Sequence, residues 1–254
     1  MHEWLHVAIV KLSQTMTAIL INIAKIAEEI DEDLDVEIEI EDKIMKQVIL
    51  IIILIASVFS FRANALTAEQ AFISAPESMF PLLNKSTRLD MIDYFNSGYT
   101  TPSKNKLSGN SRVTSIKIND LQFEMSTSSA YQIAILDLKD GTEIIALIET
   151  IKAPAIDSNI SFYTTEWEKI GDKYFAEPQL KDWLTLTGKK NIKEVESLVP
   201  FMLVGYVYDA MKGEMILNND IKSMLSEDVY ESVASYFKAQ LKYCWTGKQF
   251  KLIK

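Results

Sequence analysis

Two neighbouring stretches that are apolar on both faces constrain the fold most strongly. Residues 131–138 and 143–151 are rich in Ile, Leu and Ala at consecutive positions. Asp140-Gly141, between them, is a favourable turn for a two-stranded hairpin. A strand that is apolar on both faces has to be covered on both faces. The sequence therefore predicts a hairpin at the centre of a sheet, with a further layer packed on each side.

Two helices are predicted before this hairpin. The first, within residues 66–85, has apolar residues at helical spacing: Ala68, Ala71 and Phe72. The second spans residues 86–98, with Ser86 as the expected N-cap. Its expected apolar stripe is Leu89, Ile92 and Phe95.

Alternating and β-rich runs predict further strands around the hairpin. They cover residues 112–119, 121–129 and 158–167, and two more hairpins follow at 201–219 and 241–253. Helical patterns in the last third cover residues 179–184, 192–198 and 226–237, with Ser226 as a cap. These elements favour an α+β fold with a mainly antiparallel sheet, whose helices lie at the start of the mature chain and in its last third.

An export signal is indicated by residues 45–65. Lys46 supplies a positive start, residues 48–61 an apolar core, and Ala63-Asn64-Ala65 an A-x-A cleavage site. The alternatives are a transmembrane helix, for which the core is shorter than the roughly 20 residues required, and a buried core element. We expect cleavage after Ala65 and a location in the periplasm or at the cell surface of a Gram-negative bacterium.

The segment before this signal has the wrong charge for the start of an export signal. Residues 1–47 contain eleven acidic residues and four lysines. We expect translation to begin at Met45, so that residues 1–44 are a misassigned leader and residues 66–254 form a single mature domain. The alternative is an amphipathic helix over residues 5–30 followed by an acidic linker.

The distribution of histidine and cysteine excludes several kinds of chemistry. Both histidines, His2 and His6, precede the signal, so the mature chain has none. This excludes Ser-His-Asp and Cys-His catalysis and zinc sites that use imidazole. Cys244 is the single cysteine, so it cannot form an intrachain disulfide or a cysteine-rich metal site. We expect no metal and no cofactor.

Charge in the mature chain argues against two kinds of partner. Acidic and basic residues are nearly balanced after residue 65, and no polybasic run occurs there. Nucleic-acid binding requires a basic patch or stripe, and anionic membrane surfaces attract polybasic segments. We expect no nucleic-acid partner and no membrane span in the mature protein.

Two patterns of reactive residues carry no catalytic assignment. Ser103 and Lys106 match the S-x-x-K pattern of penicillin-recognising enzymes, but they lie in a predicted polar loop without the partner motifs. Glu166 and Glu168 would point the same way on a strand, with Trp167 on the other side. We interpret both patterns as surface features and assign no catalytic residue.

Tyr163 and Trp167 are the candidate binding residues. On a strand over residues 158–167 they would fall on the same face, opposite the apolar Ile160 and Phe162. Tyrosine and tryptophan combine an apolar ring with a polar group and are enriched at recognition surfaces. We predict that the two rings lie together as a partner surface. In the alternative, a helix packs over them and they belong to the core.

Three segments, residues 75–98, 153–167 and 243–250, resemble a family of secreted Bacteroidales proteins catalogued as domain of unknown function 3256. The resemblance covers most of the mature chain and none of residues 1–44. It rests on Pro76, Phe80, Pro81, Leu82, Leu83, Arg88, Leu89, Asp90, Ala153, Pro154, Asp157, Ser158, Phe162, Tyr163, Trp167, Tyr243, Trp245 and Phe250. The resemblance implies an envelope location and no particular activity.

Three functions stay open from the sequence. The lack of catalytic residue types, together with a large sheet and many aromatic residues, favours a binding or accessory module for a peptide, a glycan or an envelope protein. A hydrolase that uses carboxylates, the remaining general acids and bases in good supply, is the second possibility. A structural envelope protein is the third.

Overall fold

The structure is a computed structural model that describes residues 65–253 and the isolated positions Ile19, Ile21, Asn22, Lys25, Met45, Gln47 and Val48. The chain divides into two compact units, Met1–Asn64 and Ala65–Lys254, and every element named below belongs to the second. The predicted leader at 1–44 and the predicted signal at 45–65, with Ala63, lie almost wholly outside the described residues. Both stay predictions.

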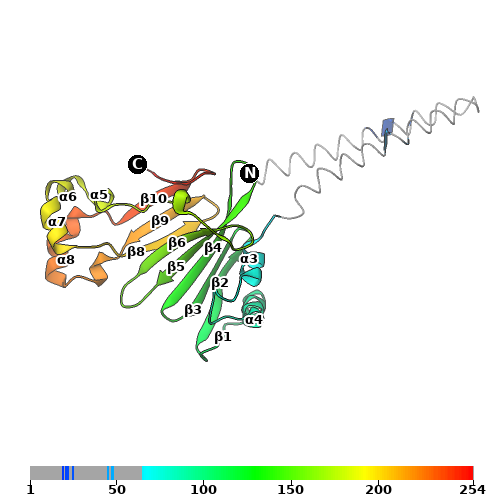
Figure 1. The fold of residues 1–254 in the computed structure, drawn as a ribbon, viewed down its shortest axis with the longest axis horizontal. Coiled ribbons are helices and arrows are strands. Elements are labelled where there is room, and N and C mark those ends of the chain that lie inside the picture. The colour runs from blue at the N-terminus through cyan, green and yellow to red at the C-terminus, as the bar shows by residue number, and fades with distance from the viewer. Residues whose placement is uncertain are drawn as a thin grey trace, which may run out of the picture. The chain divides into compact units, whose positions relative to one another are not determined.

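Two antiparallel sheets make up most of the described fold (Figure 1). The larger sheet has seven strands in sequence order: β1 (Ser103–Lys104), β2 (Asn110–Lys117), β3 (Asp120–Ser126), β4 (Ser129–Asp137), β5 (Glu143–Ile151), β6 (Asp157–Tyr163) and β7 (Lys169–Ile170). The smaller sheet has the order β11-β10-β9-β8: β8 (Val204–Asp209), β9 (Glu214–Asn219), β10 (Gln240–Trp245) and β11 (Phe250–Leu252). The predicted α+β class with a mainly antiparallel sheet is confirmed.

The predicted central hairpin is formed by β4 and β5, the fourth and fifth strands of the seven-stranded sheet. Their pairing is continuous from Ser129↔Ile151 to Asp137↔Glu143. In the turn, Asp140 Oδ1 accepts hydrogen bonds from the N–H (3.0 Å) and the hydroxyl (2.7 Å) of Thr142. Gly141 has φ +86°, a conformation that glycine adopts without steric cost. Local turn chemistry therefore sets this hairpin.

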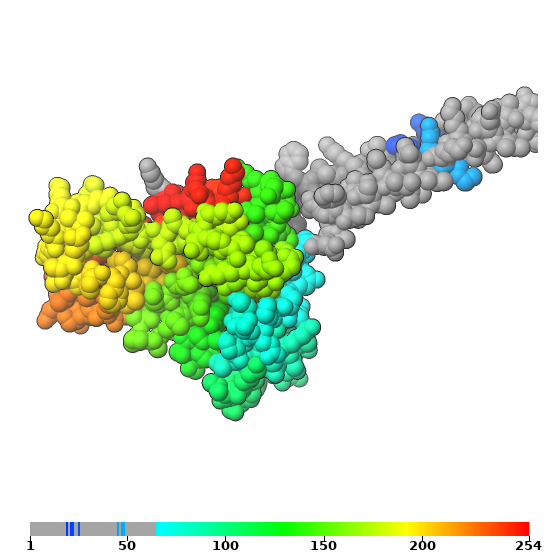
Figure 2. Space-filling model, viewed as in Figure 1, coloured from blue at the N-terminus to red at the C-terminus, as the bar shows by residue number. Residues whose placement is uncertain are grey.

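Both faces of the hairpin are covered, as its composition requires. On one face, Ile133, Ile135 and Ile145 pack with residues of α3 (Ala68–Ser74) and of the following segment, such as Phe72 and Phe80. On the opposite face, a second core joins strands of both sheets through residues that include Leu136, Ile144, Ala146, Met215 and Leu217. In the space-filling view of Figure 2, the residues of α3 and of the segment after it, in cyan, lie against green residues of the large sheet. The large sheet is thus the middle layer.

Helix α4 (Lys85–Asn96) begins earlier than predicted and buries a different face. Its N-cap is Asn84, whose Oδ1 accepts from the Thr87 N–H (2.8 Å), so Ser86 lies inside the helix. The buried residues are Arg88, Met91 and Ile92, whereas Leu89 and Phe95 are 40% and 37% exposed. The predicted stripe is therefore wrong for these two residues. Arg88 is 2% exposed, and its Nε and one terminal nitrogen are buried without a hydrogen-bond partner among the described residues; the sequence pattern did not anticipate a buried arginine.

The last third contains short helices that complete the second core. They are α5 (Leu180–Trp183), α6 (Leu186–Lys190), α7 (Ile192–Leu198) and α8 (Glu227–Val233), with the 3-10 turns η1 (Asp172–Tyr174), η2 (Ile221–Ser223) and η3 (Ala234–Tyr236). Ser226 occupies the N-cap position of α8, but its side chain makes no capping hydrogen bond. Over the residues that the structure describes, no helix has the length and apolar character needed to cross a membrane.

Candidate functional site

The candidate site lies where β8, an edge strand of the small sheet, meets the large sheet. Here side chains take the place of a neighbouring strand. Three backbone N–H groups of β8 donate to side chains of the large sheet: Val204 to Asp157 (3.3 Å), Tyr206 to Ser158 (3.0 Å) and Tyr208 to Gln132 (3.0 Å). Exposed strand edges carry unpaired N–H and C=O groups, so these contacts hold β8 against the large sheet.

Gln132 is the centre of a small buried polar network. Its Nε2 donates to the carbonyl oxygen of Tyr208 and to Asp120 Oδ1, both at 2.6 Å. Asp120 is fully buried, and burial raises the pKa of its carboxyl, while the hydrogen bond from Gln132 and the charge of Lys117 act in the opposite direction. A buried polar network of this kind is stable when each of its members is hydrogen-bonded.

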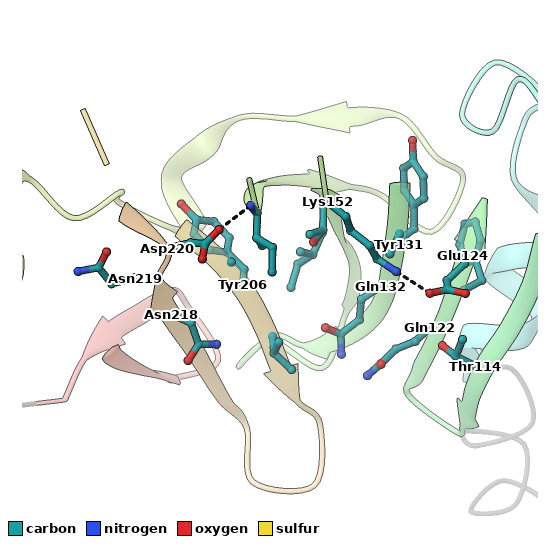
Figure 3. A pocket seen from close by; sticks show the side chains of 17 residues that line it. Thr114, Gln122, Glu124, Tyr131, Gln132, Lys152, Tyr206, Asn218, Asn219 and Asp220 are labelled. Carbon is teal, nitrogen blue, oxygen red and sulfur yellow. Dashed lines mark hydrogen bonds and ion pairs between the residues drawn. The ribbon is translucent and has the colours of Figure 1, made fainter. Parts of the chain in front are cut away.

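Beside this network a cleft of about 370 Å³ opens between the two sheets (Figure 3). β3, β4 and β5 with the residues that follow it form one wall, and β8, β9 and Asp220 form the other. Ile156 and Val207 contribute aliphatic surface and are 42% and 48% exposed. A Cβ on Gly205 would stand 2.9 Å from Ile156 Cγ2, so a larger residue there would require the Ile156 side chain to shift.

Glu124 and Lys152 form an ion pair on one side of the cleft (Figure 3). Lys152 Nζ lies 2.5 Å from Glu124 Oε1, and Arg112 Nε donates to Glu124 Oε2 at 2.8 Å. The hydrogen bond from Lys152, more than any other interaction, holds the pKa of Glu124 below its usual value, and Arg112 adds to this effect. Glu124 is therefore an anion at neutral pH and a poor proton donor, since general acids need a raised pKa.

Asp220, the other carboxylate of the cleft, is engaged as well. Its Oδ2 accepts from the Ile156 N–H (2.7 Å) and its Oδ1 accepts from the Ser223 hydroxyl (2.9 Å). Figure 3 shows Asp220 and Glu124 on opposite sides of the view, with Lys152 and Gln132 between them. Hydrolysis by two carboxylates needs one of them to donate a proton. The observed contacts do not favour such a pair.

The remaining polar groups of the cleft suit binding. Gln122 and Asn218 carry side-chain amides, each with a donor and an acceptor. Within residues 65–253, no three His, Cys, Asp or Glu side chains gather in a way that could hold a metal ion. The cleft thus combines aliphatic surface, amides and one internally neutralised ion pair, which is the composition of a recognition site.

The two predicted binding residues lie together but outside this cleft. The ring centroids of Tyr163 and Trp167 are 5.4 Å apart. β6 ends at Tyr163, and Trp167 sits in the following turn with φ +65°, so the strand predicted to residue 167 is too long. The turn forms because Thr164 N–H donates to the Glu168 carbonyl (2.9 Å).

Trp167 is covered by the domain's own helix. It is 7% exposed, its Nε1 donates to the Ala71 carbonyl oxygen of α3 (3.1 Å), and its ring meets that of Phe80 edge-on. Tyr163 is partly buried against the same core. The alternative in which a helix packs over the rings therefore describes Trp167, which offers no ring face to a partner. Glu166 and Glu168 are exposed on either side of it.

The S-x-x-K pattern also has a different environment from the one expected. Ser103 is not in a solvated loop: it begins β1 and is 6% exposed. Lys106 is on the surface, where its Nζ lies 2.9 Å from Glu77 Oε2. The two side chains thus have separate environments, and the pair gives no nucleophile-base arrangement.

Sequence reasoning missed the residues that shape the cleft. One signal was available for Gln132, which is the single amide in the apolar run of residues 131–136. A polar residue in such a run is buried only when it is hydrogen-bonded. No local sequence pattern indicates that Asp157, Ser158 and Asn218 lie at the cleft, because their positions there depend on strands that are distant in the chain.

Comparison with known proteins identifies relatives of this fold. A family model described as "Protein of unknown function (DUF3256)" matches residues 60–250. No curated protein matches the chain. A solved domain of an uncharacterized protein from Porphyromonas gingivalis W83 is similar, with a TM-score of 0.61 and 19% identity over 74% of this chain and 99% of that one. At that identity the similarity concerns the fold alone.

Proposed function

The chain belongs to the DUF3256 family of proteins of unknown function, and from this premise we propose that it is an exported binding module whose cleft accepts an extended segment of a peptide or envelope protein. The cleft between the sheets is the observation that carries the proposal. It is open, about 370 Å³ in volume, and lined by aliphatic side chains and amides rather than by a reactive pair.

The chemistry of the walls matches a polypeptide. The exposed Ile156 and Val207 suit apolar side chains, and the amides of Gln122 and Asn218 suit peptide groups, which also have one donor and one acceptor. Gln132 provides a precedent within the molecule, because its side-chain amide already pairs with the N–H and C=O of Tyr208. The amides of Gln122 and Asn218 can pair in the same way with the backbone of a strand bound in the cleft.

Export is proposed from residues 45–65. Lys46, the apolar core and the A-x-A site ending at Ala65 have the order of a cleavable signal. The proposed location is the periplasm or the cell surface of a Gram-negative bacterium, where the partners would be envelope proteins or peptides.

A displayed library of random peptides, selected against the protein produced from its full sequence, tests the binding proposal. Retained peptides should lose affinity by at least about tenfold for Val207→Asp, because the charge would lie in the apolar part of the cleft. Met211→Asp is the matched control: Met211 is 85% exposed, lies in the turn of the same hairpin and is not part of the cleft lining. Both variants should melt at the wild-type temperature.

Two results would contradict the proposal. Peptides that bind Val207→Asp as well as Met211→Asp would place recognition elsewhere. Peptides that are cleaved during incubation, as detected by mass spectrometry, and are spared by Glu124→Gln would instead favour the carboxylate-dependent hydrolase.

A further inference from the structure

A second, smaller cavity lies at the margin of the large sheet. It is a groove of about 270 Å³ between α4, the linker that follows α4, and β2. Figure 1 shows β1 and β2 at this margin beside α4. The groove shares only Thr114 with the cleft between the sheets, so it would bind its own ligand.

Aromatic side chains are exposed along this groove. Tyr94 and Tyr99 are 40% and 68% exposed, and their ring centroids lie 5.8 Å apart. Phe95, also in the lining, is 37% exposed. Exposed apolar surface that is gathered in a concave site is a mark of a ligand groove. The groove therefore offers ring faces to an apolar surface of a ligand.

Hydroxyl groups line the rest of the groove. Thr100, Thr101 and Thr114 contribute three, and Ser103 a fourth. Ser103 is 6% exposed, and its buried Oγ has no hydrogen-bond partner among the described residues. An unsatisfied buried hydroxyl is costly, and a ligand hydroxyl that gains access to it from the groove would satisfy it. This observation is independent of the exposed rings and points to the same cavity.

Charge and strand geometry narrow the class of ligand. Arg112 is the charged residue of the groove lining, and its Nε donates to Glu124 Oε2 at 2.8 Å, so its guanidinium already has a carboxylate partner. Strand addition along β2 is disfavoured, because the register of β2 shifts between Val113 and Ser115. Such bulges protect sheet edges from pairing with another strand.

We propose that this groove binds a neutral saccharide. A pyranose has C–H faces that suit the rings of Tyr94 and Tyr99, and a rim of hydroxyls that suits Ser103 and the threonines. The negative charge of a uronic acid or a sulfated sugar would have to compete with Glu124 for Arg112, the charged residue of the groove lining. This site is separate from the peptide cleft, so a failed test of sugar binding would leave the proposal of peptide binding unaffected.

Titration calorimetry with defined sugars tests the proposal. The probes are cellopentaose, maltopentaose, mannopentaose and xylopentaose, with trigalacturonic acid as the charged comparison. At least one neutral sugar should bind more tightly than trigalacturonic acid. Tyr99→Ala should weaken that sugar by at least about tenfold, as expected for an aromatic contact residue. Tyr99→Phe, which keeps the ring, should stay within about twofold of wild type.

A matched control separates recognition from folding. Phe201→Ala removes another exposed aromatic residue, 56% exposed and outside the groove, and should leave sugar binding unchanged. Ser103→Ala should weaken sugar binding while the melting temperature is maintained, because the hydroxyl has no protein partner to lose. Failure of all four neutral sugars to bind would overturn the proposal. So would tighter binding of trigalacturonic acid, equal losses for Phe201→Ala and Tyr99→Ala, or affinity that survives both Tyr99→Ala and Ser103→Ala.

Discussion

Gln132 in β4 and Tyr208 in β8 are 76 residues apart in the chain and share two hydrogen bonds. The Tyr208 N–H donates to Gln132 Oε1 at 3.0 Å, and Gln132 Nε2 donates to the Tyr208 carbonyl oxygen at 2.6 Å. One side chain therefore satisfies both backbone groups of an edge-strand residue. This contact joins the two sheets beside the proposed peptide cleft.

Gln132→Leu should destabilise the protein by about 1–3 kcal/mol, the cost of leaving buried polar partners unsatisfied. It removes the donor to Asp120 and both bonds to Tyr208. Urea unfolding measures the change. Gln122→Leu is the control, since its single bond to Asp120 is long at 3.4 Å, and it should cost less. Equal losses for the two variants would argue against a special role for Gln132.

Ile135→Ala should cost about 2–5 kcal/mol, the range for truncating a buried aliphatic side chain. Ile135 is 3% exposed in the central strand β4. Ile118→Ala, in the turn between β2 and β3 and 70% exposed, should change the unfolding free energy by less than about 0.5 kcal/mol. A loss for Ile135→Ala as small as that of Ile118→Ala would be inconsistent with a central, covered hairpin.

Asp120 should make stability depend on pH. Burial raises its pKa in the folded state, so the folded protein binds more protons than the unfolded chain from about pH 4, the ordinary value for aspartate, up through the raised value. Below about pH 4 the protonated carboxyl of Asp120 contributes its full stabilisation. This stabilisation is lost as the pH rises from there through the raised pKa of the folded state.

Comparison with Asp120→Asn isolates this effect. The unfolding free energy of the wild type, minus that of Asp120→Asn, should fall with rising pH across the window and then level off. Urea unfolding over a pH series provides the measurement. A difference that is constant, or that grows with pH, would show that Asp120 is not stabilised in its protonated form.

Lys152→Met should raise the pKa of Glu124 toward its ordinary value, because the hydrogen bond from Lys152 is the largest cause of the lowering. Arg112 keeps part of the effect through its 2.8 Å contact. A carboxyl-carbon NMR titration reports the pKa directly. Lys106→Met, which removes a partner of Glu77 instead, should leave the Glu124 titration unchanged. An unaltered Glu124 pKa in Lys152→Met would contradict the assigned cause.

The native protein should begin at Leu66. Mass spectrometry of protein isolated from the cell envelope should find this N-terminus and no peptide from residues 1–43. Replacing Ala65 with Asp should block processing, because the cleavage site requires a small residue. Detection of any peptide from residues 1–43 would show that the leader is translated.

Local chemistry was enough to determine the hairpins. Asp140-Gly141 and Thr246-Gly247 are turn sequences between β-rich runs, and glycine supplies the positive φ at positions 141 and 247. The apolar composition of residues 131–138 and 143–151 determined that both faces of the sheet are covered. These properties depend on residues that are neighbours in the chain, so the sequence pattern contains them.

Tertiary structure alone decided how the layers meet and where the sites lie. Trp167 is buried against α3, where its Nε1–H donates to the carbonyl oxygen of Ala71, 96 residues away in the chain. Val204 and Tyr206 are held by Asp157 and Ser158, at separations of 47 and 48 residues. Such contacts require the backbone of an edge strand to be aligned with particular side chains of another sheet. The spacing of apolar residues along the chain does not encode that alignment. The cleft and the groove therefore became visible only once the sheets and helices were packed together.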